Sequence, residues 1–185
     1  MVKIIGICGS PRKGNNEILL EEALKIAERE GTKTDLIILR ERKIEMCDGC
    51  LECDKTGKCH FKDDMNDIIN EMKKSDGIIF AAPTYFDDVN GLMKNFLDRL
   101  NPIGVKRELK GKKFGIITVG ATEPKSFERA IETVKIFGEI ELMEFIGSTY
   151  GKAYKNDEIV NDKEAIVKAK ELGRKLVNVC KMEAK

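Results

Sequence analysis

A group of cysteines is the feature of this sequence best suited to chemistry. Four of the six cysteines fall in residues 46–61 (MCDGCLECDKTGKCHF), a charged segment with two glycines; they are Cys47, Cys50, Cys53 and Cys59. Two-residue gaps let consecutive thiolates reach adjacent irons of a compact cube. Gly49 and Gly57 allow the backbone to bend around such a group. The spacing therefore predicts a 4Fe-4S cluster held by these four cysteines.

Two other roles for these cysteines stay open. A structural zinc site usually joins two knuckles across a longer spacer than this motif has. A disulfide is disfavoured because residues 2–8 (VKIIGIC) are too short for the apolar region of a signal peptide, so we expect a cytoplasmic, reducing location. No apolar run approaches the roughly 18 residues of a membrane span. Cys8, Cys180 and the single histidine, His60, are assigned no role.

A second candidate site follows the first apolar run, where residues 9–16 (GSPRKGNN) lead into a helical pattern. Free backbone N–H groups and the positive end of the helix dipole make such a turn an anion site, although it can also be an ordinary turn. The glycine spacing fits neither a Walker A loop nor the dinucleotide fingerprint. We therefore expect a mononucleotide phosphate, bound without a metal. The candidate residues are Ser10, Arg12, Lys13, Gly14, Asn15 and Asn16.

Two later loops suit a flat ring. In residues 82–91 (APTYFDDVNG), Pro83 is expected to end a strand, while Thr84, Tyr85 and Phe86 offer a hydroxyl, a backbone edge and two aromatic rings. In residues 118–124 (TVGATEP), Gly120 and Ala121 are small enough for close backbone approach. A planar heterocycle needs apolar faces and donors at its edge, which these loops provide. The alternative is that the aromatic rings only cover the core.

Alternating strands and helices must bring these loops together. Strongly apolar strands indicate a parallel sheet covered on both faces, and right-handed crossovers leave few arrangements. We predict one α/β domain over residues 1–185, a doubly wound five-stranded sheet of order 2-1-3-4-5, with the ligand site beyond the carboxyl ends of the strands. Another α/β layout is the alternative. The expected strands are 2–8, 34–39, 77–82, 113–119 and 140–146, and the expected helices are 16–30, 63–74, 92–100, 126–137 and 162–181.

The charge balance excludes two classes of partner. The chain has 33 Lys and Arg against 32 Asp and Glu, a net charge of +1. Neither nucleic acid nor an anionic membrane is expected as the main partner of so nearly neutral a protein.

The loops after the first, third and fourth expected strands resemble those of a known family. GSPRKGNN, residues 82–99 (APTYFDDVNGLMKNFLDR) and TVGAT, in that order, resemble the flavodoxin-like NADPH-dependent FMN reductases. The resemblance implies FMN with its phosphate on Ser10, Arg12, Asn15 and Asn16. It places the isoalloxazine against Pro83, Thr84, Tyr85 and Phe86, with Gly120 and Ala121 on its other side. Many relatives have a glycine where this chain has Ala121.

The cysteine motif inside such a chain resembles the iron–sulfur flavoproteins of anaerobic archaea and bacteria, a branch of the same superfamily. That resemblance implies a 4Fe-4S cluster, non-covalent FMN, a homo-oligomer and a ferredoxin-type electron donor. The cysteine segment follows the second strand, at one edge of the sheet, whereas the ring belongs over the third and fourth strands. We therefore predict that the cluster of one subunit faces the FMN of another, in a dimer or tetramer.

Two other functions remain open on the sequence. The protein can be an NAD(P)H-dependent FMN or quinone reductase whose cluster is only structural. It can also be a flavin-binding scaffold that docks a partner through a zinc knuckle. No nucleophile–base pair and no carboxylates placed for hydrolysis are visible, so no side chain is assigned a catalytic role.

Overall fold

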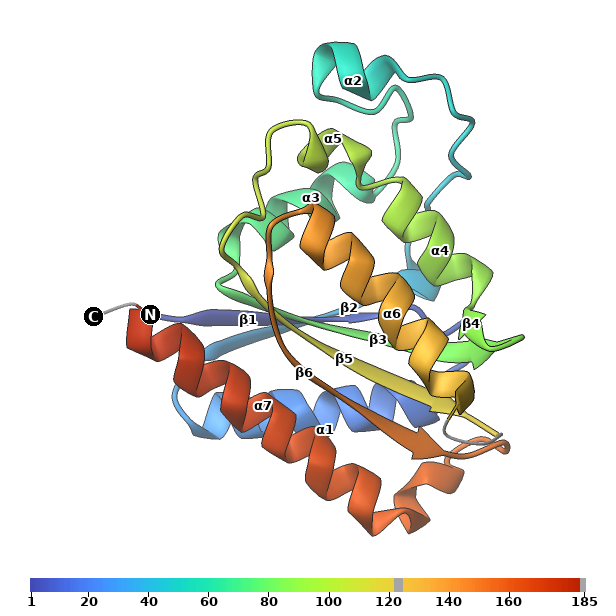
Figure 1. Cartoon of the computed structure of the whole chain (residues 1–185), viewed down its shortest axis with the longest axis vertical. Coiled ribbons are helices and arrows are strands. Elements are labelled where there is room, and N and C mark those ends of the chain that lie inside the picture. The colour runs from blue at the N-terminus through green and yellow to red at the C-terminus, as the bar shows by residue number, and fades with distance from the viewer. Residues whose placement is uncertain (122–124, 184–185) are drawn as a thin grey trace.

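Parallel strands form the centre of the molecule (Figure 1). The structure is a computed structural model and describes residues 1–121 and 125–183. The strands follow the order β2-β1-β3-β5-β6, and a short β4 pairs antiparallel with β3. β1 and β5 are almost wholly buried, as expected for a parallel sheet covered on both faces. The bounds are β1 Lys3–Cys8, β2 Lys33–Ile38, β3 Gly77–Tyr85, β4 Asp88–Val89, β5 Lys113–Gly120 and β6 Glu144–Lys152.

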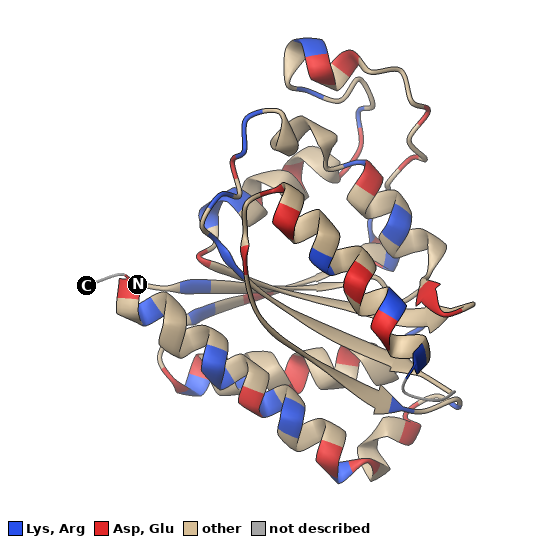
Figure 2. Ribbon diagram, in the orientation of Figure 1, with Lys and Arg blue, Asp and Glu red and all other residues tan. Residues whose placement is uncertain are grey.

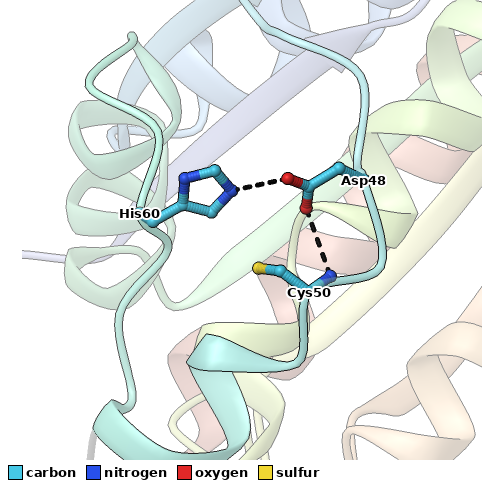
Figure 3. A group of neighbouring side chains, drawn as sticks. All are labelled: Asp48, Cys50 and His60. Atoms are coloured by element: carbon cyan, nitrogen blue, oxygen red, sulfur yellow. Dashed lines mark hydrogen bonds and ion pairs between the residues drawn. The ribbon is translucent and has the colours of Figure 1, made fainter.

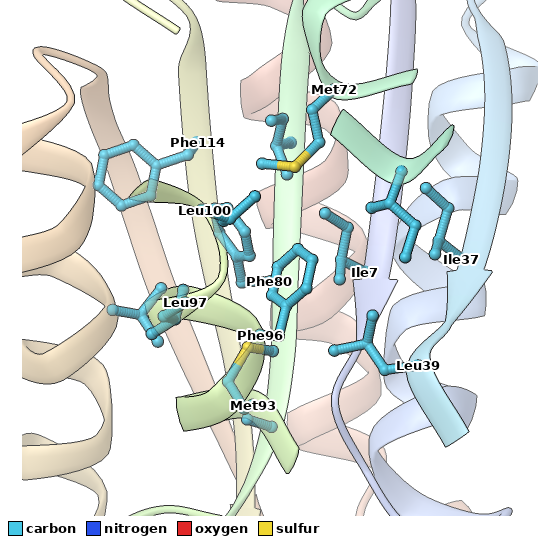
Figure 4. Close-up of a cluster of buried hydrophobic side chains, with 14 of the residues drawn as sticks. Ile7, Ile37, Leu39, Met72, Phe80, Met93, Phe96, Leu97, Leu100 and Phe114 are labelled. Carbon is cyan, nitrogen blue, oxygen red and sulfur yellow. The ribbon is translucent and has the colours of Figure 1, made fainter. Parts of the chain in front are cut away.

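Helices cover both faces of the sheet (Figure 1). α1 (Asn15–Arg29) and α7 (Lys163–Glu183) pack on one face; α3 (Met65–Lys74), α4 (Gly91–Asp98) and α6 (Lys125–Ile140) pack on the other. Each face therefore has its own apolar core. Figure 4 shows the core on the face covered by α3, α4 and α6, where Phe80 of β3 lies against Met93 and Phe96 of α4. The short elements are η1 Leu39–Glu41, α2 Glu52–Thr56, α5 Asn101–Gly104 and η2 Glu158–Asn161.

The predicted α/β fold is right in outline and wrong in its strand count. With β4 set aside, the path of the parallel strands has the predicted 2-1-3-4-5 order. The sheet has six strands, however, because β3 continues through Pro83 to Tyr85 and turns back into β4. Pro83 is tolerated because β3 pairs with β1 only as far as Ala81, so its missing N–H breaks no bond on that side.

The last predicted strand is also misplaced. Residues 140–146 were expected to be a strand, but α6 continues to Ile140 and β6 begins only at Glu144. The turn between them has a left-handed backbone at Leu142, with φ of 58°. A leucine rarely adopts this conformation, so the sequence gives no sign of the turn. β6 therefore runs on to Lys152, and its carboxyl end reaches the same edge of the sheet as the other strands.

The cysteine segment lies outside the sheet, beyond the ends of α4 and α6 (Figure 1). It contains one short helix, α2, which the sequence did not predict. In the described residues, no helix combines the length and the apolar character that crossing a membrane requires. Residues 122–124, part of the fourth-loop motif, lie outside the described residues.

Candidate functional site

A cavity of about 170 Å³ opens where the carboxyl ends of β1, β3, β5 and β6 meet. This is the edge at which doubly wound sheets bind ligands. All the residues proposed from the sequence for phosphate and ring line it, except Gly14 and Phe86. The lining residues are Ser10, Arg12, Lys13, Asn15, Asn16, Pro83, Thr84, Tyr85, Val119, Gly120, Ala121, Ala153, Tyr154 and Asn156.

The first loop is shaped by its own hydrogen bonds. Ser10 Oγ donates to the Arg12 carbonyl (2.8 Å) and accepts from the Arg12 N–H (3.2 Å), which closes a tight turn. Gly14 follows with φ of 137°, a conformation that favours glycine, and the helix α1 starts at the next residue. The amino end of this 15-residue helix therefore faces the cavity with its partial positive charge.

The two asparagines of this loop have different roles in the structure. Asn15 Nδ2 donates to the Lys155 carbonyl (2.8 Å), and its Oδ1 accepts from the Ile159 N–H (3.2 Å), so its side chain fixes the segment after β6. Asn16 is buried and lines the cavity, and its Oδ1 has no hydrogen-bond partner among the described residues. An orphaned acceptor of this kind suits a hydroxyl-bearing ligand such as a ribityl phosphate.

Phe86 lies away from the cavity. It is fully exposed, with a relative exposure of 103%, at the tip of the β3–β4 turn. Phe86 and Asp87 both have left-handed backbones there, with φ of 51° and 64°. Its neighbour Tyr85 does line the cavity. Phe86 is therefore placed at the protein surface and does not line the cavity.

Sequence reasoning missed one wall of this cavity. Ala153, Tyr154 and Asn156 follow β6, and they were overlooked because the last strand was placed too early. The signal was the stretch GSTYGKAY after residue 146, in which Thr149, Tyr150 and Tyr154 favour a strand. Every parallel strand must deliver its carboxyl end to the same edge, so this run belonged to the site.

A second cavity, of about 470 Å³, is lined by all four cysteines of the motif. Cys47 and Cys50 are exposed, and Cys53 and Cys59 are half-buried. The rest of the wall comes from the end of α4, from α5 and from the last turn of α6. All six cysteines of the chain are free thiols. Four thiols converging on one cavity are the donor set of an iron–sulfur cluster, so the residues present fit that group.

Three backbone positions give the cysteine segment its shape. Gly49 and Gly57 have φ of 69° and 68°, which is the bending that their positions in the sequence predicted. Leu51 also has a left-handed backbone, with φ of 58°, and α2 begins immediately after it. Such strain in a non-glycine residue is tolerated where the surroundings fix it.

Asp48 links the two ends of the motif (Figure 3). Its Oδ1 accepts from the Cys50 N–H (3.2 Å), and its Oδ2 lies 2.9 Å from His60 Nε2. Ligand atoms of Asp48, Cys50 and His60 lie within 4.8 Å of one another. The bond to the Cys50 side chain, with smaller contributions from the Cys50 N–H and His60, lowers the pKa of Asp48. His60 thus has a partner, and Asp48 is a residue of the site that the sequence did not single out.

A buried ion pair holds both ends of the segment to α4. The Arg99 guanidinium donates from Nη1 to Asp63 Oδ2 (2.7 Å) and from Nη2 to Asp63 Oδ1 (3.0 Å), and both side chains are 1% exposed. Nη1 also donates to the Glu45 carbonyl (2.6 Å), and the guanidinium lies over the Phe61 ring. Burial opposes the charge of Asp63, but the bonds from Arg99 and from two backbone N–H groups outweigh it and lower its pKa.

The two remaining cysteines lie elsewhere. Cys8 ends β1 and Cys180 lies on α7, and both are buried. Burial raises the pKa of each thiol to about 11. Neither of them lines the cysteine cavity, and no role is assigned to either.

The two cavities lie at opposite ends of α6. A side chain on Gly120 would touch Phe127 in the first turns of α6, whereas Ile140 and Glu141 at its other end line the cysteine cavity. The shorter helix α4 also reaches both sites, since Met93 lies against Gly9 and Asn95 Oδ1 accepts from the Cys47 N–H. The two cavities share no lining residue.

Known proteins are similar to this chain in sequence and in fold. The family model for NADPH-dependent FMN reductase matches residues 2–154. An iron–sulfur flavoprotein of Methanocaldococcus jannaschii is 35% identical over 195 aligned positions, covering 98% of each chain. One from Methanosarcina thermophila is 33% identical over 148 positions, covering 79% of this chain and 78% of its own.

Among solved structures, a flavone reductase superposes with a TM-score of 0.79 at 24% identity. The superposition covers 97% of this chain and 63% of that one, and it supports the fold alone. The family match spans every strand, the edge at which they end and the cysteine segment, and the Methanocaldococcus jannaschii relative extends the similarity over 98% of the chain. The chain belongs to the NADPH-dependent FMN reductase family and, within it, to the iron–sulfur flavoproteins.

Proposed function

We propose that the protein carries electrons from a ferredoxin-type donor through a 4Fe-4S cluster to FMN and on to an acceptor. Membership of the family makes it an FMN-dependent oxidoreductase with FMN and an iron–sulfur cluster as cofactors. The observation that carries the proposal is the convergence of Cys47, Cys50, Cys53 and Cys59 on one cavity, apart from the cavity at the strand ends. FMN exchanges electrons singly or in pairs, which would couple a one-electron donor to a two-electron acceptor.

The residues of the first cavity would hold FMN in a fixed orientation. The turn from Ser10 to Gly14 and the amino end of α1 would bind the phosphate, with Arg12 and Lys13 supplying charge. Pro83, Thr84 and Tyr85 would pack against one side of the ring, with Gly120 and Ala121 on the other. Ala121 brings one more methyl group to the cavity than a glycine would.

The surface beside the cysteine segment favours an acidic donor. Figure 2 shows Lys and Arg positions on the ribbon along the α3 side of this end of the molecule, with Asp and Glu positions in α2. Lys58, Lys73 and Lys106 line a hollow there, and only Lys73 has an ion pair within the described residues, with Glu108. A cationic surface next to the cluster would attract an acidic redox protein and speed its encounter.

Replacing Cys50 by Ser should remove the cluster and leave FMN bound. The variant lacks one of four thiolates, and the flavin cavity shares no residue with the cysteine cavity. Iron, acid-labile sulfide and EPR after dithionite reduction, measured on anaerobic protein, would show the loss, while the flavin band keeps its height. Cys180→Ser, a buried thiol outside the cavity, is the matched control and should keep both cofactors.

The same preparations separate the alternatives. Wild-type protein with one zinc and no sulfide would contradict the proposal and support the scaffold. The family's NADPH-dependent reductases make nicotinamide the other donor to test. Flavin bleaching by NADPH or NADH in wild type and Cys50→Ser alike, with none from reduced ferredoxin, would support a reductase with a structural cluster.

We also propose that electrons pass between subunits of a homo-oligomer, because the two cavities of one chain are separate and share no lining residue. Electron transfer slows steeply with distance, so a neighbouring subunit whose cluster faces this FMN cavity would offer the shorter path. Cys50→Ser subunits, which bind FMN only, should regain donor-driven flavin reduction when mixed with Gly120→Ala subunits, which keep the cluster but have a crowded flavin cavity. Native mass spectrometry verifies the mixed oligomers, and mixed oligomers without regained reduction would contradict transfer between subunits.

A further inference from the structure

Polar side chains from α4 and α5 reach the cysteine segment at three points. Asn95 lies on α4, Arg99 directly follows the last residue of that helix one turn further on, and Asn101 opens α5. Asn95 contacts only the backbone of the segment: its Oδ1 accepts from the Cys47 N–H (3.1 Å) and its Nδ2 donates to the Glu45 carbonyl (3.2 Å). The other two side chains reach sulfur.

Asn101 is bonded to a cysteine of the motif. Its Nδ2 donates to Cys53 Sγ (3.0 Å) and to Asp54 Oδ1 (2.6 Å). Both amide protons are therefore used within α2, and one of them points at a sulfur that lines the cavity. The residue is exposed, so its replacement leaves the core intact.

Arg99 has an N–H group without an acceptor. Its Nη1 donates to Asp63 and to the Glu45 carbonyl and its Nη2 donates to Asp63, whereas its Nε–H is buried and has no hydrogen-bond partner among the described residues. The Arg99 side chain is 1% exposed and lines the cysteine cavity together with Cys59. A buried donor left without an acceptor costs free energy, which a sulfur acceptor in the cavity would remove.

We propose that Arg99 and Asn101 are positioning residues that donate N–H···S hydrogen bonds to the ligand sulfurs of Cys59 and Cys53, and so raise the reduction potential of the cluster. Hydrogen bonds to sulfur and nearby charge are the means by which a protein tunes such a potential. N–H donors and a cation stabilise the more negative, reduced form more than the oxidised form. The inference rests on the proposed function, since it requires the cluster.

Asn101→Leu tests the Asn101 bond without disturbing the core. Leu has a similar size and no donor, so the midpoint potential, measured by anaerobic EPR-monitored redox titration, should move to a more negative value while the flavin potential stays. Asn95→Leu is the matched control, since it removes two bonds to the same segment but none to sulfur. It should leave the midpoint potential where it is, even if less cluster is bound.

Three outcomes would overturn the proposal. An unchanged potential in Asn101→Leu would show that its bond to Cys53 has no effect on the cluster. Equal shifts in Asn101→Leu and Asn95→Leu would show that loosening the segment, rather than losing an N–H···S bond, is responsible. Wild-type protein without any cluster signal would reject the proposed function itself, and this inference with it.

Arg99 needs a test that keeps its ion pair, because its variants can fail to fold. Wild-type protein with ¹⁵N-labelled arginine should show a ¹⁵N coupling in pulsed EPR of the reduced cluster. The coupling should persist in labelled Arg107→Lys, whose arginine contacts the Ile140 carbonyl at the surface. Absence of the coupling in the wild type, or its loss in Arg107→Lys, would overturn the role of Arg99.

Discussion

Asp63→Asn is expected to lower the free energy of unfolding by about 3–5 kcal/mol, the usual cost of removing one partner of a buried ion pair. Asp63 and Arg99 are both 1% exposed, and Asn leaves the guanidinium buried without a counter-charge. The same carboxylate accepts from the backbone N–H groups of Glu45 and Met65. The variant should therefore loosen both ends of the cysteine segment as well as weaken the fold, as urea unfolding of anaerobic protein and iron content would measure.

The effect should fade in acid. The pKa of Asp63 is lowered in the folded protein, so its ionisation stabilises the fold at any pH above the unfolded value of about 3.8. That stability is lost as the pH falls through the lower, folded pKa. Wild type and Asp63→Asn should thus differ fully at pH 7, begin to converge below about pH 3.8 and converge completely only below the lower, folded pKa, because the amide introduced by the substitution has no proton to take up.

Asp98→Asn is the matched control for this prediction. Asp98 is the partner of Lys94 across one turn of α4, at 2.5 Å, but both side chains are about half exposed. Exposed pairs of this kind typically contribute about 0–1 kcal/mol. Equal losses of stability in the two variants, or a loss below about 1 kcal/mol for Asp63→Asn, would show that the buried pair does not hold the segment.

Features encoded by a few neighbouring residues were predictable from the sequence. The cysteine spacing and the two glycines within it identified a segment whose four thiols do share one cavity. The loops after β1, β3 and β5 could be placed together without coordinates, because parallel strands deliver their carboxyl ends to one edge. Local pattern and the geometry of parallel sheets were sufficient to bring most of each set of candidate residues to one cavity.

Side chains that act across the fold were not predictable. Arg99 and Asn101 approach the cysteine segment from positions 36 to 54 residues away in the sequence, and nothing local marks them. The β3–β4 turn was missed because its left-handed residues are Phe86 and Asp87 rather than the usual glycine or asparagine. That turn decides where Phe86 lies. The left-handed backbone of Leu142 ends α6 and delays the start of the last strand. The strand therefore lies later in the sequence than predicted, and Tyr154, which follows it, was not expected in the cavity.

Gly120→Ala is expected to weaken FMN binding by roughly 5- to 150-fold. A Cβ at this position would lie 2.1 Å from Thr84 Oγ1 and 2.9 Å from the Phe127 ring, closer than atoms can approach. Overpacking of this kind costs about 1–3 kcal/mol, and each 1.4 kcal/mol changes Kd tenfold. Thr84 and Gly120 both line the cavity, so the displaced hydroxyl moves into space that we assign to the ring. Flavin fluorescence titration of the apoprotein would measure Kd.

Two further variants identify steric crowding as the cause. Gly91→Ala adds the same methyl group where nothing lies within 4 Å, so its Kd should match that of the wild type. Thr84→Ala added to Gly120→Ala removes the atom at 2.1 Å and should recover part of the lost affinity, although Phe127 still crowds the site. If the double variant binds FMN no better than Gly120→Ala, then Thr84 does not transmit the clash. If Gly120→Ala binds as tightly as wild type, the ring lies somewhere other than between β3 and β5.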